Sequence, residues 1–333
     1  MSKIKQLLAV ALVAVFTSHP AKAQVEPHFS QYYMYPLWLN PALTGAIDGN
    51  YRVAAIHRNQ WSGIDNGFST TGLSADFVTK KNINLGVNLL QQNAGSVGYK
   101  YNNAQVSVCY TGVRFGHEGD KVITFALQGG LLNRRFDLSK AQSDNQFNPN
   151  TGSYDPSRSL DEAGKSSATS FDMNAGMFYY DADPDKKVNI FAGFAAGHIT
   201  QPEDPSLSAG YHEKLPVRYT VHGGANIYLS EKAHLIPNAL YMRQGSVSET
   251  MLGGYVQFAA TSTTDVMLGA NYRINDAYYP YAGLSFDSFT LGLSYDVTTS
   301  QLGKTINGTG SFELSLMYTG KKKEKGFFKS PRF

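Results

Sequence analysis

The stretch "KNINLGVNLL", from Lys81 to Leu90, decides the class of fold. Its apolar side chains stand at every second position from Ile83 to Leu89, and asparagine or glycine stands between them. A period of two is that of a β-strand with one apolar and one polar face. The same alternation returns in "DVMLGANYR" (265–273), "DSFTLGLSYDV" (287–297) and "SFELSLMYT" (311–319).

The first residues carry the pattern of a secretory signal peptide. Lys3 and Lys5 form a basic start, the apolar run 7–16 is too short to span a bilayer as a helix, and "AKA" (21–23) supplies small residues for cleavage. The alternative, a membrane-anchoring helix, needs about 18 apolar residues. No cysteine stands after the apolar run to carry a lipid. We therefore expect residues 1–23 to be removed on export.

The composition points to a barrel in the outer membrane. Charged residues make up only 17% of the 333 residues and aromatic residues 13%, and there are 32 glycines. The mean hydropathy is −0.28, so apolar residues must be interleaved with polar ones. Transmembrane barrels do this by alternating lipid-facing and lumen-facing side chains. The single cysteine, Cys109, cannot form an internal disulfide, and a net charge of +3 gives no nucleic-acid signal.

Turn signals divide the rest of the chain into about fourteen strands. We expect these to start near residues 51, 70, 82, 101, 121, 170, 187, 216, 232, 250, 264, 280, 288 and 311. Short connections such as 116–120 alternate strictly with longer ones such as 134–169, which favours a transmembrane barrel over a soluble β-sandwich. We therefore predict an all-β, closed, antiparallel, up-and-down transmembrane β-barrel over residues 51–320. A bulge or strand end is expected at Pro237, and an even strand count predicts both termini on the periplasmic side.

Polar residues opposite the apolar faces are expected to line the lumen. They either conduct a solute or form a hydrogen-bonded interior filled by side chains or a plug, and both interpretations stay open. These residues are Asp76, Asn84, Asn88, Asp172, Asn174, Arg273 and Glu313.

No catalytic motif stands out in the chain, which has no G-x-S-x-G, no H-E-x-x-H and no phosphate loop. His117 with Asp120, and Asp181, Asp183 and Asp185 in "DADPDKK", carry metal-ligand groups. Their spacing matches neither a zinc nor a calcium pattern, so polar turns are the better interpretation. We expect no metal, no other cofactor and no enzyme activity.

The segment "QVEPHFSQYYMYPLWLNPALTG" (24–45) fits neither a strand nor a helix, because Pro27, Pro36 and Pro41 interrupt both. It nevertheless holds too many aromatic side chains for a disordered tail. These side chains either pack into the lumen as a plug or dock on a periplasmic protein. We treat residues 24–50 as a separate N-terminal segment.

This segment and the "HRNQW" that follows it (57–61) resemble the start of the PorP/SprF family of type IX secretion system outer-membrane proteins. That family opens with Asp-Pro-x-Phe-Ser-Gln-Tyr, continues with Asn-Pro repeats ending in Gly, and places Arg-x-Gln-Trp on its first strand. Glu26 and Tyr35 replace the usual Asp and Asn. The expected structural or partner-docking motif is Pro27, Phe29, Ser30, Gln31, Tyr32, Pro36, Trp38, Asn40, Pro41, Gly45, Arg58, Gln60 and Trp61.

The C-terminal tail, residues 321–333, is basic and aromatic. Its "SPRF" ending is similar to the tails of the same family. We expect a periplasmic contact there, although a run of lysines is usually only a solvated tail. The residues concerned are Lys321, Lys322, Lys323, Lys325, Arg332 and Phe333.

The resemblance implies a non-enzymatic component of the type IX secretion system in the outer membrane of a Gram-negative bacterium. Its implied partners are outer-membrane lipid, periplasmic ring proteins of that system and secreted surface proteins such as gliding adhesins, which it exports or anchors. The residues alone leave two alternatives. One is a general porin or hydrophobic-solute channel, and the other is a surface hydrolase whose site is assembled from external loops.

Overall fold

The computed structural model describes residues 26–61, 67–95, 98–140, 142, 144–155, 157, 166–204, 213–300 and 310–320. The expected signal peptide (1–23) and the basic tail (321–333) lie outside these residues.

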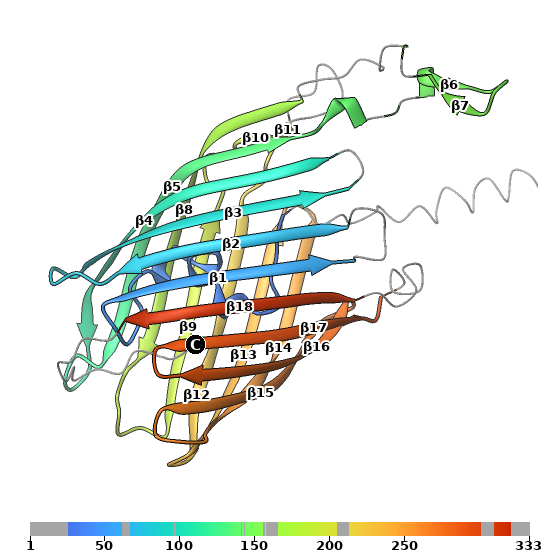
Figure 1. Ribbon diagram of the computed structural model, residues 1–333. Coiled ribbons are helices and arrows are strands. Elements are labelled where there is room, and N and C mark those ends of the chain that lie inside the picture. The colour runs from blue at the N-terminus through green and yellow to red at the C-terminus, as the bar shows by residue number, and fades with distance from the viewer. Residues whose placement is uncertain are drawn as a thin grey trace, which may run out of the picture.

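Fourteen antiparallel strands close into one barrel, as predicted (Figure 1). Their order around the wall follows the chain, and the first strand pairs with the last. The strands are β1 (Tyr51–Gln60), β2 (Phe68–Phe77), β3 (Ile83–Ala94), β4 (Tyr99–Phe115), β5 (Lys121–Arg135), β8 (Ser167–Asp181), β9 (Val188–Gly197), β12 (Arg218–Ser230), β13 (Ala233–Gln244), β14 (Val247–Ala259), β15 (Thr264–Arg273), β16 (Ala277–Phe286), β17 (Phe289–Thr298) and β18 (Ser311–Gly320).

Smaller elements lie in the connections that follow β5 and β9 along the chain. One hairpin is formed by β6 (Phe147–Asn148) and β7 (Ser153–Tyr154), and another by β10 (Glu203–Asp204) and β11 (Glu213–Lys214). Two 3₁₀ turns, η3 (Leu138–Lys140) and η4 (Asp144–Gln146), precede the first hairpin.

Side chains alternate between the two faces of the wall, as the sequence pattern requires. On β3, Leu85, Val87 and Leu89 are exposed on the outside, and Asn84 and Asn88 are buried on the inside. The outer face is therefore an apolar belt suited to lipid, and the inner face is polar. Among the described residues, no helix is long and apolar enough to span a bilayer.

The two mouths of the barrel differ. The connections after β1, β3, β5, β9 and β17 open at one end, which we call the long-loop mouth, and the turns after β2, β4, β8, β12, β14 and β16 lie at the other, the short-turn mouth. The alternation of long and short connections is less strict than predicted. Only residues 245–246 join β13 to β14 and residues 274–276 join β15 to β16, although both lie at the long-loop mouth.

Every barrel strand begins within three residues of its predicted start. The expectation at Pro237 is wrong, since β13 runs through this residue and pairs it with Gly254 on β14 without a register shift. On the other side, Pro237 forms no pair with Ala225 of β12. The missing N–H group of proline is thus accommodated by a local gap in one ladder instead of a bend.

Candidate functional site: a plug in the barrel lumen

The N-terminal segment folds into the lumen as a plug, which we define as residues 26–46. It forms three short turns, η1 (Tyr32–Met34), α2 (Pro36–Leu39) and η2 (Pro41–Leu43). Pro36 and Pro41 each occupy the first position of a turn, where the missing N–H group costs nothing. The Asn40 side chain caps η2 by accepting from the Ala42 N–H at 2.9 Å. The prolines that exclude a strand or a long helix thus begin compact turns.

Aromatic side chains of the plug reach distant parts of the wall. The Tyr35 hydroxyl donates to the Leu89 carbonyl on β3 at 2.6 Å, and the Tyr32 hydroxyl donates to Asn238 Oδ1 on β13 at 2.6 Å. Strands β3 and β13 lie on nearly opposite sides of the barrel. The plug therefore fills the lumen and does not lie along one side of it.

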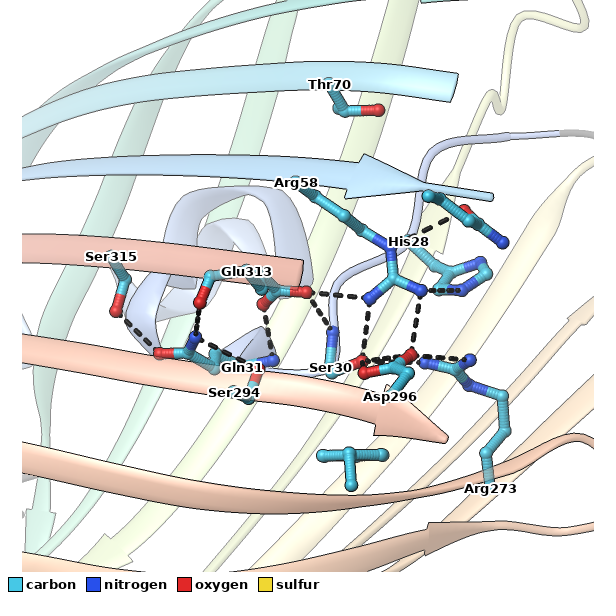
Figure 2. A network of polar contacts seen from close by, with 12 residues as sticks. His28, Ser30, Gln31, Arg58, Thr70, Arg273, Ser294, Asp296, Glu313 and Ser315 are labelled. Atoms are coloured by element: carbon cyan, nitrogen blue, oxygen red, sulfur yellow. Dashed lines mark hydrogen bonds and ion pairs between the residues drawn. The ribbon is translucent and has the colours of Figure 1, made fainter. Parts of the chain in front are cut away.

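A buried ion network fastens the start of the plug to the wall where β1 meets β18 (Figure 2). Arg58 on β1 lies 2.8 Å from Glu313 on β18 and 2.9 Å from Asp296 on β17. The Ser30 hydroxyl donates to Asp296 at 2.7 Å and accepts from Arg58 and from Arg273, and the Ser30 N–H donates to Glu313 at 2.8 Å. All three charged side chains of the Arg58 pairs are at most 2% exposed. Two arginines thus face two carboxylates around one plug residue.

Gln31 extends this network along β17 and β18. Its N–H donates to the Glu313 carboxylate at 2.7 Å, its Nε2 donates to Ser294 Oγ at 3.1 Å, and its Oε1 accepts from Ser315 Oγ at 2.7 Å. A Cβ at Gly292 would lie 2.3 Å from Gln31 Oε1, so the close approach needs glycine on the wall. We call Ser30, Gln31, Arg58, Arg273, Asp296 and Glu313 the seam network.

Glu26 forms a second buried ion cluster. Its carboxylate oxygens lie 2.6 Å from His198 Nε2 and 2.8 Å from Arg218 Nη1, and His198 Nδ1 lies 3.0 Å from Asp172. Burial alone would raise the pKa of Glu26, but His198 and Arg218 lower it to about 2. Burial alone would lower the pKa of His198, but Glu26 and Asp172 raise it to about 9. Glu26 and His198 are therefore both charged at neutral pH.

A third set of contacts holds the C-terminal end of the plug. The Gly45 N–H donates to Asp76 Oδ2 at 2.7 Å, and Asp76 pairs with Arg52 at 2.9 Å. Arg52 also donates to the Leu43 carbonyl at 3.0 Å. Gly45 has a φ of +76° and a Cβ there would meet Asn84 at 2.1 Å, so glycine is required for both reasons.

The plug runs from one mouth of the barrel to the other. Glu26 contacts His198, which follows β9, and Arg218, which begins β12, so it lies at the long-loop mouth. Gly45 lies at the short-turn mouth, where Gly320, the last described residue, pairs with the start of β1. The two ends of the described chain, Glu26 and Gly320, therefore lie at opposite mouths, and the expected periplasmic placement of both termini stays a prediction. The described ends are separated because the plug passes through the whole barrel before β1 begins.

Most residues of the predicted motif come together in the lumen. Trp38 contacts another part of the plug, since its Nε1 donates to the Pro27 carbonyl at 3.1 Å. The Arg218 guanidinium lies over the Trp38 ring at 4.6 Å. Trp61 is separate, since it packs against Phe68 beyond the end of β1. Buried in the lumen are Pro27, Phe29, Ser30, Gln31, Tyr32, Pro36, Asn40, Pro41, Arg58 and Gln60, and Trp38 and Gly45 are partly buried.

Among the charged wall residues described above, four were named neither in the predicted motif nor among the predicted lumen residues: Arg52, His198, Arg218 and Asp296. A usable signal existed for three of them, because a charged residue at an inward position of a strand needs a buried partner. His198 lies just after β9 and carried no such signal.

The acidic turns that the sequence pointed to meet at the short-turn mouth. Ligand atoms of Asp120, Asp181 and Asp183 lie within 4.8 Å of one another. Lys186 Nζ lies 2.7 Å from Asp181 and 3.6 Å from Asp183, so an internal cation balances part of this charge. His117 is exposed.

A closed barrel with an apolar outer belt and its own N-terminal segment in the lumen defines a plugged outer-membrane barrel. A family model described as "Type IX secretion system membrane protein PorP/SprF" matches residues 21–318. The chain belongs to this family, as the resemblance predicted, and is a type IX secretion component of the outer membrane.

Comparison with curated proteins finds no match. Among solved structures, a TodX deltaS2S3 mutant monoaromatic hydrocarbon channel is 11% identical with a TM-score of 0.52, covering 86% of this chain and 94% of that one. The P. putida toluene transporter TodX is 9% identical with a TM-score of 0.49, covering 90% and 95%. A NanC porin is 9% identical with a TM-score of 0.40, covering 82% and 100%. The first of these likenesses supports the barrel fold alone.

Proposed function

We propose that this protein is a plugged, non-enzymatic platform of the type IX secretion system. It docks periplasmic ring proteins at its short-turn mouth and exports or anchors secreted surface proteins such as gliding adhesins. The long-loop mouth faces the outside of the cell, in keeping with the usual placement of longer loops in outer-membrane barrels.

The observation that carries this proposal is the anchored plug. The seam network and the Glu26 cluster hold it toward the long-loop mouth, and the Asp76 contact holds it at the short-turn mouth. Breaking one buried ion pair costs about 3–5 kcal/mol, so a plug that leaves with each passing solute is disfavoured. A filled lumen suits a protein that works through its two mouths.

The alternative is a channel for hydrophobic solutes, as the TodX structures are named. The cavity between the plug and the wall, lined by Tyr32, Tyr255, Tyr279 and other residues, has a volume of about 40 Å³. Such a cavity accommodates a water molecule but no aromatic solute. The lining itself is aromatic, which is the one feature that favours this alternative.

Conductance separates the two functions. The purified protein in planar bilayers is expected to give no large, steady current, whereas a variant lacking residues 30–43 gives one. A large, steady current from the unmodified protein, together with normal secretion in a deletion strain, would eliminate the platform.

Docking is tested by site-specific photocrosslinking in cells. Probes at Lys81 and Lys232, which are exposed at the short-turn mouth, are expected to capture periplasmic components of the secretion system. A probe at Lys140, exposed at the long-loop mouth, is the matched control and is expected to capture none of them. Capture of the same components from Lys140 alone would place docking at the wrong mouth.

A further inference from the structure

The outer face of the barrel is not uniform around the long-loop mouth. Aromatic side chains point outward at this end on most strands from β9 to β18: Phe194, Tyr219, Tyr241, Tyr272, Tyr278, Tyr295 and Phe312. Such girdles mark the level of the membrane interface. On β1 to β5 and on β8, the last two outward positions at this mouth are all polar instead. These residues are His57, Asn59, Ser69, Thr71, Gln91, Asn93, Lys100, Asn102, Asn133, Arg135, Ser167 and Thr169.

Six of these residues stand directly opposite one another across neighbouring strands. We call them the polar ladder: His57, Thr71, Gln91, Asn102, Asn133 and Thr169. Gln91 Nε2 donates to Asn102 Oδ1 at 3.1 Å, Asn102 Nδ2 donates to Asn133 Oδ1 at 3.4 Å, and Asn133 Nδ2 donates to Thr169 Oγ1 at 2.8 Å. A carboxamide nitrogen has two hydrogens. Gln91 and Asn102 therefore each keep an N–H group that these bonds do not use.

An apolar floor lies next to the ladder on its short-turn side. Leu73, Leu89, Ala104 and Leu131 line, together with ladder residues, an open groove of about 540 Å³ on the outside of the wall. This volume is within the range of sites that hold a small ligand.

A cationic rim lies on the other side of the ladder. Lys100 and Arg135 are direct cross-strand neighbours, and like charges in this position repel. Hydrogen bonds from Ser139 lower the pKa of Asp137, to which Lys140 and Arg135 add smaller contributions, and Asp137 pairs with Lys140 at 3.8 Å. Among the described residues, this corner carries Lys100, Arg135 and Lys140 beside the Asp137 carboxylate, and an anion seated between the first two would relieve their repulsion.

The apolar belt is also shorter in this sector. On β1, three outward residues from Tyr51 to Ala55 precede His57, whereas β17 has five apolar outward residues from Phe289 to Val297. Polar groups at the depth of His57 need polar partners, because acyl chains offer none.

We propose that this groove binds the phosphorylated sugar headgroup of an outer-leaflet glycolipid. Lys100 and Arg135 hold the phosphate, the ladder carboxamides bond the sugar hydroxyls, and the acyl chains lie on the leucine floor. The placement of the glycolipid in the outer leaflet rests on the orientation given in the proposed function, but binding of the lipid does not. The lipid proposal and the proposed function can therefore fail independently.

The test uses the full-length mature protein in detergent, titrated with diphosphoryl lipid A and with its dephosphorylated form. Retained lipid is counted by native mass spectrometry, and the unfolding temperature is followed in parallel. We expect K100A/R135A to weaken retention of the diphosphoryl form about tenfold or more, the size of a lost charge-assisted hydrogen bond. A second variant, N102L/N133L, removes two ladder carboxamides and keeps both cations. We expect it to retain the diphosphoryl lipid several-fold more weakly than the unmodified protein. The matched control, K214A/R243A, removes two exposed cations at the same mouth in another sector and is expected to change nothing.

Three results would overturn the proposal. Equal retention by the unmodified protein and both groove variants would leave the ladder as an inert polar rim. Equal binding of the dephosphorylated lipid would remove the role of the cations. Unchanged lipid binding, with loss of a co-purifying protein from the groove variants, would assign the face to a protein partner.

Discussion

At the scale of single residues, Arg58 links the plug to the wall most directly. Its guanidinium group contacts two carboxylates and the Ser30 hydroxyl at once. Arginine suits this position because its planar group carries five donors in a fixed geometry, whereas lysine offers a single point charge. The Arg-x-Gln-Trp pattern on the first strand is thereby explained at its first position. Gln60 supports Arg58 by accepting from its Nε at 3.4 Å.

Replacing Arg58 by methionine leaves Asp296 and Glu313 buried without this cation. We expect R58M to lower the free energy of unfolding by about 3–5 kcal/mol. R58K should lower it by less, because lysine keeps the charge but not the planar set of donors. Urea titration of the refolded protein in lipid vesicles measures this. R243M, at an exposed arginine of β13, is the control and should stay within about 0.5 kcal/mol of the unmodified protein. An equal loss in both variants would contradict a special role for Arg58.

Gly72 permits the plug to approach β2. A Cβ at this position would lie 2.6 Å from the Tyr35 ring, so G72V pushes that ring away and destabilises the protein by about 1–3 kcal/mol. Because the clash is with one side chain, the double variant G72V/Y35L is expected to recover part of the loss. Thermal unfolding of the single and double variants measures the recovery, and strictly additive losses would refute the contact.

At the scale of elements, the strands were predictable and the plug was not. A period of two is local information, and it located every start because inward and outward positions have opposite chemistry. The turns of the plug depend on distant residues, since Ser30 is held by side chains 266 and 283 positions further along the chain. The sequence showed that the rings of Tyr32 and Tyr35 must be buried but not by which surface. The choice between a plug and a docking segment therefore stayed open.

The start of the plug is expected to loosen at alkaline pH. His198 has a raised pKa, so its contribution is complete below its unfolded pKa of 6.5 and is lost as pH rises through about 9. Glu26 has a lowered pKa, so its contribution is lost only as pH falls from 4.5 through about 2. Fluorescence of Trp38 in a W61F background reports this end of the plug, because Arg218 lies over the Trp38 ring.

The matched variant for this titration is H198N in the same W61F background. It should remove the change between pH 6.5 and 9 and keep the acid change. An alkaline transition of the same size in H198N would assign the effect to another group.

At the scale of the whole molecule, the barrel has two chemically different ends, and the plug runs through the lumen between them. The long-loop mouth carries the small hairpins and the polar ladder, and the short-turn mouth carries the acidic cluster of Asp120, Asp181 and Asp183. The orientation of these ends in the membrane determines which partner each can meet.

Orientation is measured by cysteine labelling in a C109S background, in which the buried native thiol is removed. K140C should react with a membrane-impermeant maleimide in intact cells, and K232C only after the outer membrane is permeabilised. The reverse pattern would invert the proposed placement of both mouths.

The meeting of β1 and β18 over Arg58 and Glu313 has a consequence for biogenesis. The carboxylates that accept from the Ser30 and Gln31 N–H groups and from the Ser30 hydroxyl belong to the last two strands to be synthesised. A polypeptide truncated before β17 therefore lacks these acceptors, although Arg58 and Arg273 remain. Closing the barrel and completing the seam network are a single late event, and an incomplete copy leaves two arginines buried without these carboxylates.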